Sequence, residues 1–220
     1  MFLTLSGVDI KSDQNNKSEI VKTLLACLRQ KDKYTHGHSL RVAYYCTLIG
    51  ASLDLKPEEK IELELAGLLH DLGKIGIPDN ILLKPARLDD EEFKVMQMHP
   101  VKTSIILKSL TELDEVANIA KHHHERYDGN GYPNGLVAEN IPLFSRAILI
   151  ADTFDAMTST RPYRKGLPYE MAFAELNKFA GSQFDPFLVK RFINILEKNN
   201  EEKQENFALS LLPGEFKKAA

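Results

Sequence analysis

The chain has 220 residues, 43% hydrophobic and 27% charged, an ordinary globular composition with room for a substantial core. Its net charge of −3 gives no electrostatic reason to expect a nucleic-acid polymer or an anionic membrane as partner. Two cysteines, Cys27 and Cys46, form neither a disulfide framework nor a zinc motif, and no apolar run reaches the roughly 18–20 residues of a membrane span. We therefore expect a cytoplasmic protein without nucleic-acid or membrane partners.

The N-terminal quarter of the chain predicts two helices. One covers 17–31 with apolar residues on one face, and the second opens near Asp32 and runs to about Leu53. His38 lies on the inward face of the second helix, because apolar side chains follow it at helical spacing. These side chains are Val42, Cys46 and Ile49. His36, by contrast, lies on the solvent side or caps the helix.

The third predicted helix starts at Pro57, runs to Lys74 and carries the adjacent pair His70 and Asp71 near its end. Its core stripe consists of Ile61, Leu65, Leu68 and Leu72. His70 lies on the neighbouring face. An unpartnered buried carboxylate is costly, and a metal ion is the simplest partner for an imidazole and a carboxylate together. One such dipeptide is nevertheless more often an ordinary core or surface pair.

The remaining helices are separated by proline, glycine and histidine. Asp89 is a predicted N-cap, His99-Pro100 marks a helix break, and a turn-rich loop follows the histidines at 122–124. The predicted helices are 79–84, 90–98, 101–110, 113–124, 142–159, 168–180 and 186–199. The charged tail beyond them is expected to be loose. Neither strands nor internal repeats are indicated, so the fold class is all-α.

Seven side chains of metal-ligand type are spread over these helices. They are His38, His70, Asp71, His99, His123, His124 and Asp152. Asp71, among the histidines, is the natural bridge between two ions, and Asp152 needs a partner on its apolar helix. Taken singly, His99 or His123 is more often a capping or core residue, and the histidine run can be a solvated helix end. Together the seven suffice for two metal ions with positions left for water or phosphate.

Arg161 and Arg164 lie three residues apart in a turn that contains proline. Alone they indicate surface charge, but beside a metal site they suit bidentate contacts to phosphate. Two metal ions and nearby arginines match the hydrolysis of a phosphodiester, which needs a nucleophile at neutral pH and neutralisation of an anionic substrate.

Several segments form a motif set that is highly specific in combination. They are His70-Asp71 with Lys74, His99-Pro100, His123-His124-Glu125, Gly129-Asn130-Gly131-Tyr132-Pro133 and the stretch 152–164. Over about residues 30–198 the chain resembles the HD-GYP family, metal-dependent phosphodiesterases of the bacterial second messenger cyclic di-GMP within the HD superfamily. The resemblance implies an HD-type helical bundle with a metal centre in its core and a Gly-Tyr-Pro loop at its mouth.

The resemblance also implies a division of the chain and of its site residues. An N-terminal segment with one helix (1–31) precedes the catalytic domain (32–198) and a tail (199–220). One metal ion is held by His38, His70, Asp71 and Asp152. A second ion, bridged by Asp71, is held by His99, His123 and His124. Phosphate or the catalytic water is served by Lys74, Asp155, Arg161 and Arg164, and the nucleotide pocket is shaped by Gly131, Tyr132 and Pro133.

One position departs from the pattern of some family members, which hold a third metal ion with a glutamate four residues before the first ligand histidine. Here that position is Tyr34. A phenol is a poor ligand and is ordinarily neutral at pH 7, so we expect two divalent ions, iron or alternatively manganese. No third ion would then offset the charge of the terminal phosphate of linear pGpG. We therefore expect hydrolysis of cyclic di-GMP to stop at pGpG, with GMP formed slowly if at all.

Two alternative functions stay open. An HD hydrolase of another nucleotide is disfavoured by the Gly-Tyr-Pro loop, and a catalytically weak module that binds cyclic di-GMP or a protein is disfavoured by the complete ligand set. The resemblance also implies signalling proteins as partners, such as diguanylate cyclases or a sensory partner.

Overall fold

The computed structural model describes residues 13–160 and 165–198. Its α-helices are α1 (Asp13–Lys31), α2 (Lys33–Ser52), α3 (Pro57–Leu69), α4 (Asp79–Leu82), α5 (Asp90–Met96), α6 (His99–Lys108), α7 (Asp114–Lys121), α8 (Leu143–Thr158), α9 (Tyr169–Lys178) and α10 (Pro186–Lys198). Short 3-10 helices are η1 (Leu72–Gly76), η2 (Thr111–Leu113) and η3 (Ala138–Asn140). Within the described ranges, extended pairing is limited to one isolated bridge between Ala180 and Phe184. The prediction of an all-α fold is confirmed.

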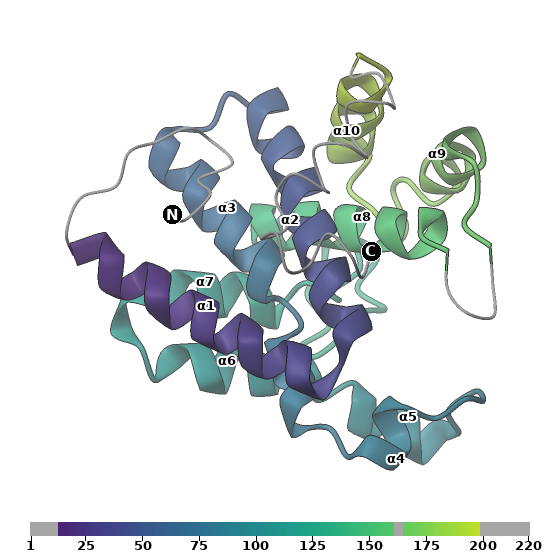
Figure 1. The fold of residues 1–220 in the computed structure, drawn as a ribbon. Coiled ribbons are helices and arrows are strands. Elements are labelled where there is room, and N and C mark those ends of the chain that lie inside the picture. Colours follow the sequence, from purple (N-terminus) through teal and green to yellow (C-terminus); the bar gives the residue numbers. More distant parts are fainter. Residues whose placement is uncertain (1–12, 161–164, 199–220) are drawn as a thin grey trace.

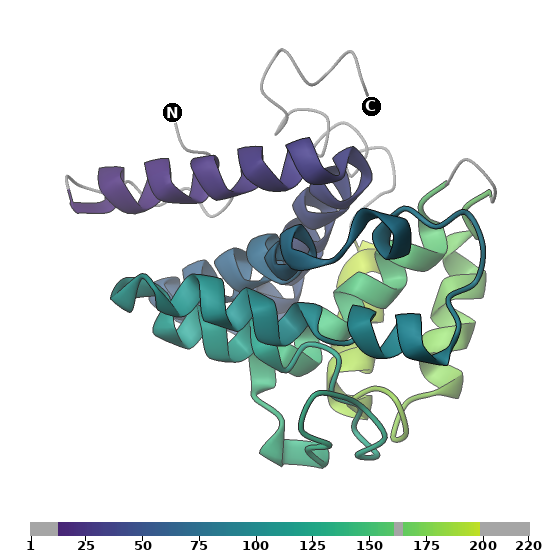
Figure 2. The ribbon, with the colours of Figure 1, turned by 90° about the horizontal axis from the view of Figure 1, so that it is seen from below.

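The bundle is built around α2 and α3, which pack against each other (Figure 1). Helix α2 also contacts α8 and α10, whereas α3 also contacts α7 and α8. Helix α1 lies along one side of the bundle, against α2 and η1 (Figure 2). The core between α2, α8 and α10 contains Phe154, whose ring meets Tyr45 and Phe192 edge to face at 5.1 Å each. None of the described helices is long and apolar enough to cross a bilayer.

Local signals explain where several helices begin. The predicted cap Asp89 accepts hydrogen bonds from the backbone N–H groups of Glu91 and Glu92, and the Glu92 carboxylate accepts one from the N–H of Asp89. This reciprocal box satisfies N–H groups that have no partner inside α5. Asp32 likewise accepts from the N–H of Tyr34 at the start of α2.

The predicted end of the third helix is wrong. Helix α3 stops at Leu69, His70 is its C-cap, and residues 72–76 form η1 instead of continuing to Lys74. The reason is a close approach to α6: a Cβ at Gly73 would lie 2.0 Å from the carbonyl oxygen of His99. The α-helical conformation ends before this contact, so Asp71 lies between the end of α3 and the start of η1.

The buried face of α3 also differs from the predicted stripe. Leu68 and Leu72 are buried as predicted, but Ile61 and Leu65 are only half-buried, whereas Leu63, Ala66 and His70 have no exposed surface. This face is the more buried one because α3 packs between α2, α7 and α8. His70 therefore points into the bundle.

The histidines at 99 and 122–124 lie at helix ends, but α6 begins two residues before its predicted start and α7 ends three residues before its predicted end. His99 is the first residue of α6, and α7 ends at Lys121, before the histidine run. Arg161, Arg164 and the tail from 199 lie outside the described residues. The predicted domain boundaries stay a prediction.

Candidate metal centre

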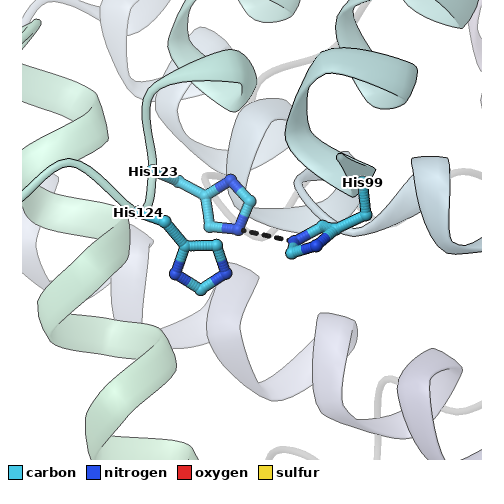
Figure 3. Close-up of side chains that lie close together, drawn as sticks. All are labelled: His99, His123 and His124. Atoms are coloured by element: carbon cyan, nitrogen blue, oxygen red, sulfur yellow. Dashed lines mark hydrogen bonds between the residues drawn. The ribbon is translucent and has the colours of Figure 1, made fainter. Parts of the chain in front are cut away.

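The fold brings all seven predicted ligands together from five parts of the chain. They come from the second turn of α2, the middle of α8, the end of α3, the start of α6 and the turn after α7. Three overlapping groups have ligand atoms within 4.8 Å of one another: His99, His123 and His124; His38, His70 and Asp152; and His70, Asp71 and His123. Figure 3 shows the first group, whose rings converge from the start of α6 and the turn after α7.

Three of the imidazoles are held by backbone carbonyls three residues earlier. The Nδ1–O distances are 2.7 Å from His70 to Gly67, 2.8 Å from His99 to Met96 and 2.7 Å from His123 to Ala120. A carbonyl oxygen can only accept, so each Nδ1 carries a hydrogen, and in the neutral ring Nε2 is the nitrogen with the lone pair. This arrangement is typical of histidines that bind a metal through Nε2.

The lone pairs on these Nε2 atoms fit a bound cation. The Nε2 atoms of His99 and His123 lie 3.4 Å apart (Figure 3). In neutral rings with the hydrogen on Nδ1, two lone pairs face each other across this distance. Among the described residues the buried Nε2 of His70 has no hydrogen-bond partner. Buried polar atoms without partners are destabilising, and a divalent metal ion would satisfy all three nitrogens. The residues present therefore fit the metal.

Asp71 lies between the two halves of the centre. Its Oδ1 is 3.2 Å from Nε2 of His99, and its Oδ2 is 3.4 Å from Nε2 of His70 and 3.9 Å from Nε2 of His38. Lys74 donates to Oδ2. Burial alone would raise the pKa of Asp71, but the charge of Lys74 and the neighbouring imidazoles hold it well below its usual range. Asp71 is therefore an ionised carboxylate within reach of both groups of ligands.

His38 differs from the other ligands because two carboxylates contact its ring. Its Nε2 lies 3.1 Å from Oδ1 of Asp152, and its Nδ1 lies 2.6 Å from Oδ2 of Asp155. Burial opposes protonation, but the two carboxylates raise the pKa of His38 to about 9. A cation between His38 and Asp152 would take the place of this proton.

Asp155 lies behind His38, away from Asp152. Its carboxylate is fully buried and accepts two hydrogen bonds from Arg41, at 2.6 Å and 3.1 Å. The prediction that Asp155 serves phosphate or the catalytic water does not fit these contacts, which favour orientation of His38. Arg41 was missed, although its position one turn after His38 on the same helix was a signal.

His123 and His124 are suited to bind as neutral imidazoles. Burial and the neighbouring His99 lower the pKa of His124 to about 3, and burial with His124 and His70 takes the pKa of His123 well below its usual range. Metal ions bind the neutral ring, so neither residue has to lose a proton.

The loop that contains Gly131, Tyr132 and Pro133 lies beside the centre. The Tyr132 ring stacks on the His124 ring, with centroids 4.8 Å apart. The backbone N–H of Tyr132 donates to the backbone carbonyl of His124 at 3.2 Å. A Cβ at Gly131 would lie 2.2 Å from the backbone nitrogen of Arg126, so only glycine fits there. The loop is thus packed directly against one ligand.

Two further residues anchor this loop, and no role was predicted for either of them from the sequence. Glu125 is fully buried, and its two oxygens accept the N–H groups of Asn134 at 2.6 Å and Leu136 at 3.0 Å. His122 approaches the Asn134 side chain, with Nε2 at 3.2 Å from Oδ1. The sequence could have indicated a role for Glu125, because its carboxylate follows directly after two candidate ligands.

Tyr34 lies beside the centre, one turn before His38 on α2. Its ring is stacked against the ring of His38, with centroids 6.2 Å apart and planes 7° from parallel. A phenol, not a carboxylate, therefore occupies this side of His38.

Comparisons with known proteins show the family to which the chain belongs. A family model described as HD domain matches residues 22–188. A cyclic di-GMP phosphodiesterase of Thermotoga maritima is 38% identical over 80% of this chain and 49% of its own length. A 3′3′-cGAMP-specific phosphodiesterase 3 of Vibrio cholerae is 40% identical over 76% of this chain and 37% of its own length. The chain thus spans half or less of the curated relatives it matches here.

Solved structures share the fold. A cyclic GMP-AMP specific phosphodiesterase of V. cholerae, V-cGAP3, superposes with a TM-score of 0.65 at 20% identity, covering 90% of this chain and 54% of that one. Bd1817, an HDGYP protein from Bdellovibrio bacteriovorus, has a TM-score of 0.60 at 22% identity and covers 74% of this chain and 52% of its own.

Proposed function

The chain belongs to the HD domain family, with the motif set of its HD-GYP branch, and we propose that it is a metal-dependent phosphodiesterase that hydrolyses cyclic di-GMP. Relatives named as cyclic di-GMP phosphodiesterases support the substrate, and family membership implies dependence on a divalent metal. The observation that carries the proposal is the convergence of Nε2 lone pairs around the carboxylate of Asp71.

We further propose that each chain binds two metal ions, which are iron or alternatively manganese. His38, His70 and Asp152 hold the first ion, and Asp71 bridges to the second. The second ion is held by His99, His123 and His124. Mixed imidazole and carboxylate ligation suits both metals. When bound, the ions neutralise charge on the phosphodiester and supply a nucleophile at neutral pH.

The chain's own residues bind and orient the substrate. The ammonium of Lys74 lies against Asp71 with 21% of its side chain exposed, so it can pair with a phosphate oxygen brought to the centre. The Tyr132 ring offers an aromatic surface beside His124 on which a base can stack. We also propose that Arg161 and Arg164 contact phosphate, because of their position in the sequence motif.

The proposed product is linear pGpG. Its further cleavage to GMP requires accommodation of a terminal phosphate, and the neutral Tyr34 beside His38 offers no carboxylate for a third ion. The product is therefore released after the ring-opening cut.

A second candidate substrate is 3′3′-cGAMP. Relatives named as 3′3′-cGAMP-specific phosphodiesterases are as similar to this chain as those named for cyclic di-GMP. The two substrates differ in one purine base, so their phosphodiester chemistry at the centre is the same.

The test is hydrolysis by the full chain loaded anaerobically with Fe²⁺ or Mn²⁺. Cyclic di-GMP and 3′3′-cGAMP are incubated separately, and products are resolved by chromatography, with chelator-treated protein as the control. We expect pGpG from cyclic di-GMP, and faster turnover of 3′3′-cGAMP would favour the second candidate. No product from either substrate by protein that retains metal would overturn the proposal.

A further inference from the structure

We propose that Arg41 and Asp155 are positioning residues for His38: Arg41 holds the carboxylate of Asp155, which fixes the ring of His38 and so tightens metal binding. The inference rests on the proposed metal centre and goes beyond it, because neither the motifs nor the comparisons assign a role to Arg41.

The arrangement follows from two helices that present residues at the same spacing. His38 and Arg41 lie three apart on α2, and Asp152 and Asp155 lie three apart on α8, which packs against α2. Residues three apart share a helix face. The ring of His38 is therefore held between Asp152 at Nε2 and Asp155 at Nδ1, with Arg41 on the outer side of Asp155.

The Asp155 carboxylate is fully occupied by these contacts. Its Oδ1 accepts from Nε of Arg41 at 2.6 Å and from Oγ of Ser159 at 3.0 Å. Its Oδ2 accepts from Nη2 of Arg41 at 3.1 Å and contacts Nδ1 of His38 at 2.6 Å. The forked guanidinium fixes the plane of the carboxylate. An ionised carboxylate only accepts, so the Nδ1 of His38 carries a hydrogen, and Nε2 is the atom that binds metal when the cation replaces its proton.

His38 depends on this contact more than its neighbours depend on theirs. His70, His99 and His123 are each held by a carbonyl close before them in the chain, which no side-chain substitution removes. His38 is held instead by a side chain 117 residues away, on another helix. Removing Arg41 leaves Asp155 with Ser159 and His38 as partners, so the carboxylate and the ring of His38 are held less firmly.

A buried arginine–aspartate pair can also serve only to join two helices, and a second such pair in this chain tests that alternative. Arg146 on α8 binds Asp185, next to α10, and both side chains are largely buried. The contacts of Arg146 include no proposed metal ligand. Loss of either pair destabilises the fold, but only loss of the Arg41 pair should weaken metal binding.

The experiment compares wild type with Arg41→Ala, Arg41→Gln, Arg41→Lys and Arg146→Lys. Full-length protein loaded with Mn²⁺ is equilibrated with increasing chelator, and retained metal is measured by elemental analysis. We expect binding to weaken about 10–100-fold in Arg41→Ala and Arg41→Gln, the usual range for residues that orient a ligand. Arg41→Lys should recover part of this loss, and Arg146→Lys should lower Tm without changing metal affinity.

A spectroscopic measurement checks the cause. In Zn²⁺-loaded wild type, nitrogen NMR should report His38 protonated at Nδ1. The same proton should exchange faster in Arg41→Gln. This variant keeps a polar side chain and therefore serves if Arg41→Ala fails to fold. Unchanged metal affinity and proton exchange in every folded Arg41 variant, or equal loss of metal in Arg146→Lys, would overturn the inference alone. Wild type that retains no metal would overturn the proposed function as well.

Discussion

Replacing Glu125 with glutamine should displace the Gly-Tyr-Pro loop without emptying the metal centre. The buried carboxylate accepts the N–H groups of Asn134 and Leu136, so both of its oxygens act as acceptors. Glutamine keeps one acceptor and turns the other into an NH₂ group, which cannot accept. One backbone N–H therefore loses its partner and faces a second donor.

The size of the effect follows from the bond that is lost. A hydrogen bond to a charged group contributes about 1.5–3 kcal/mol. At about 1.36 kcal/mol per factor of ten, the balance between the ordered and displaced loop shifts about 10–150-fold. Because the Tyr132 ring reaches the centre only while the loop is ordered, we expect kcat/KM for cyclic di-GMP to fall by up to this factor. Metal content should stay the same, since Glu125 does not contact the proposed ligand atoms.

The assay combines steady-state hydrolysis, elemental analysis and amide hydrogen exchange. The amides of Asn134 and Leu136 should exchange faster in Glu125→Gln than in wild type. Glu139→Gln is the matched control, because it makes the same charge change at an exposed position of the same loop region, where Glu139 accepts from the Tyr127 hydroxyl. Unchanged exchange at both amides, or the same loss of activity in the control, would refute the assigned role.

Three further predictions concern the centre and its substrate. Asp71→Ala should abolish hydrolysis and reduce metal below two ions per chain while circular dichroism stays helical; turnover above a few per cent with normal metal content would contradict this. Arg161→Ala should lower kcat/KM about 10–150-fold through loss of a charged hydrogen bond of about 1.5–3 kcal/mol, with metal content unchanged; loss of metal would make Arg161 a structural residue. Time courses should show cyclic di-GMP consumed much faster than pGpG, and comparable rates for the two would refute the argument from Tyr34.

Much of this protein follows from local sequence signals. The all-α class follows from helical periodicity, and the start of α5 from Asp89 and Glu92, which satisfy each other's backbone groups within three residues. The convergence of seven ligand-type side chains was also predictable, because a carboxylate such as Asp71 among histidines and apolar residues needs a partner. The helical periodicity and the helix cap depend on chemistry within a few residues, whereas the ligand set was predicted from motifs spread over residues 38–152.

Contacts between distant residues decided the rest. Helix α3 ends at Leu69 because Gly73 must approach α6, a contact that no periodicity in residues 57–74 indicates. The partner of Asp155 is Arg41, 114 residues earlier, and the two meet only because α2 packs on α8. Hydrogen bonds of this kind depend on where helices cross, and helix crossings are set by the packing of the whole core.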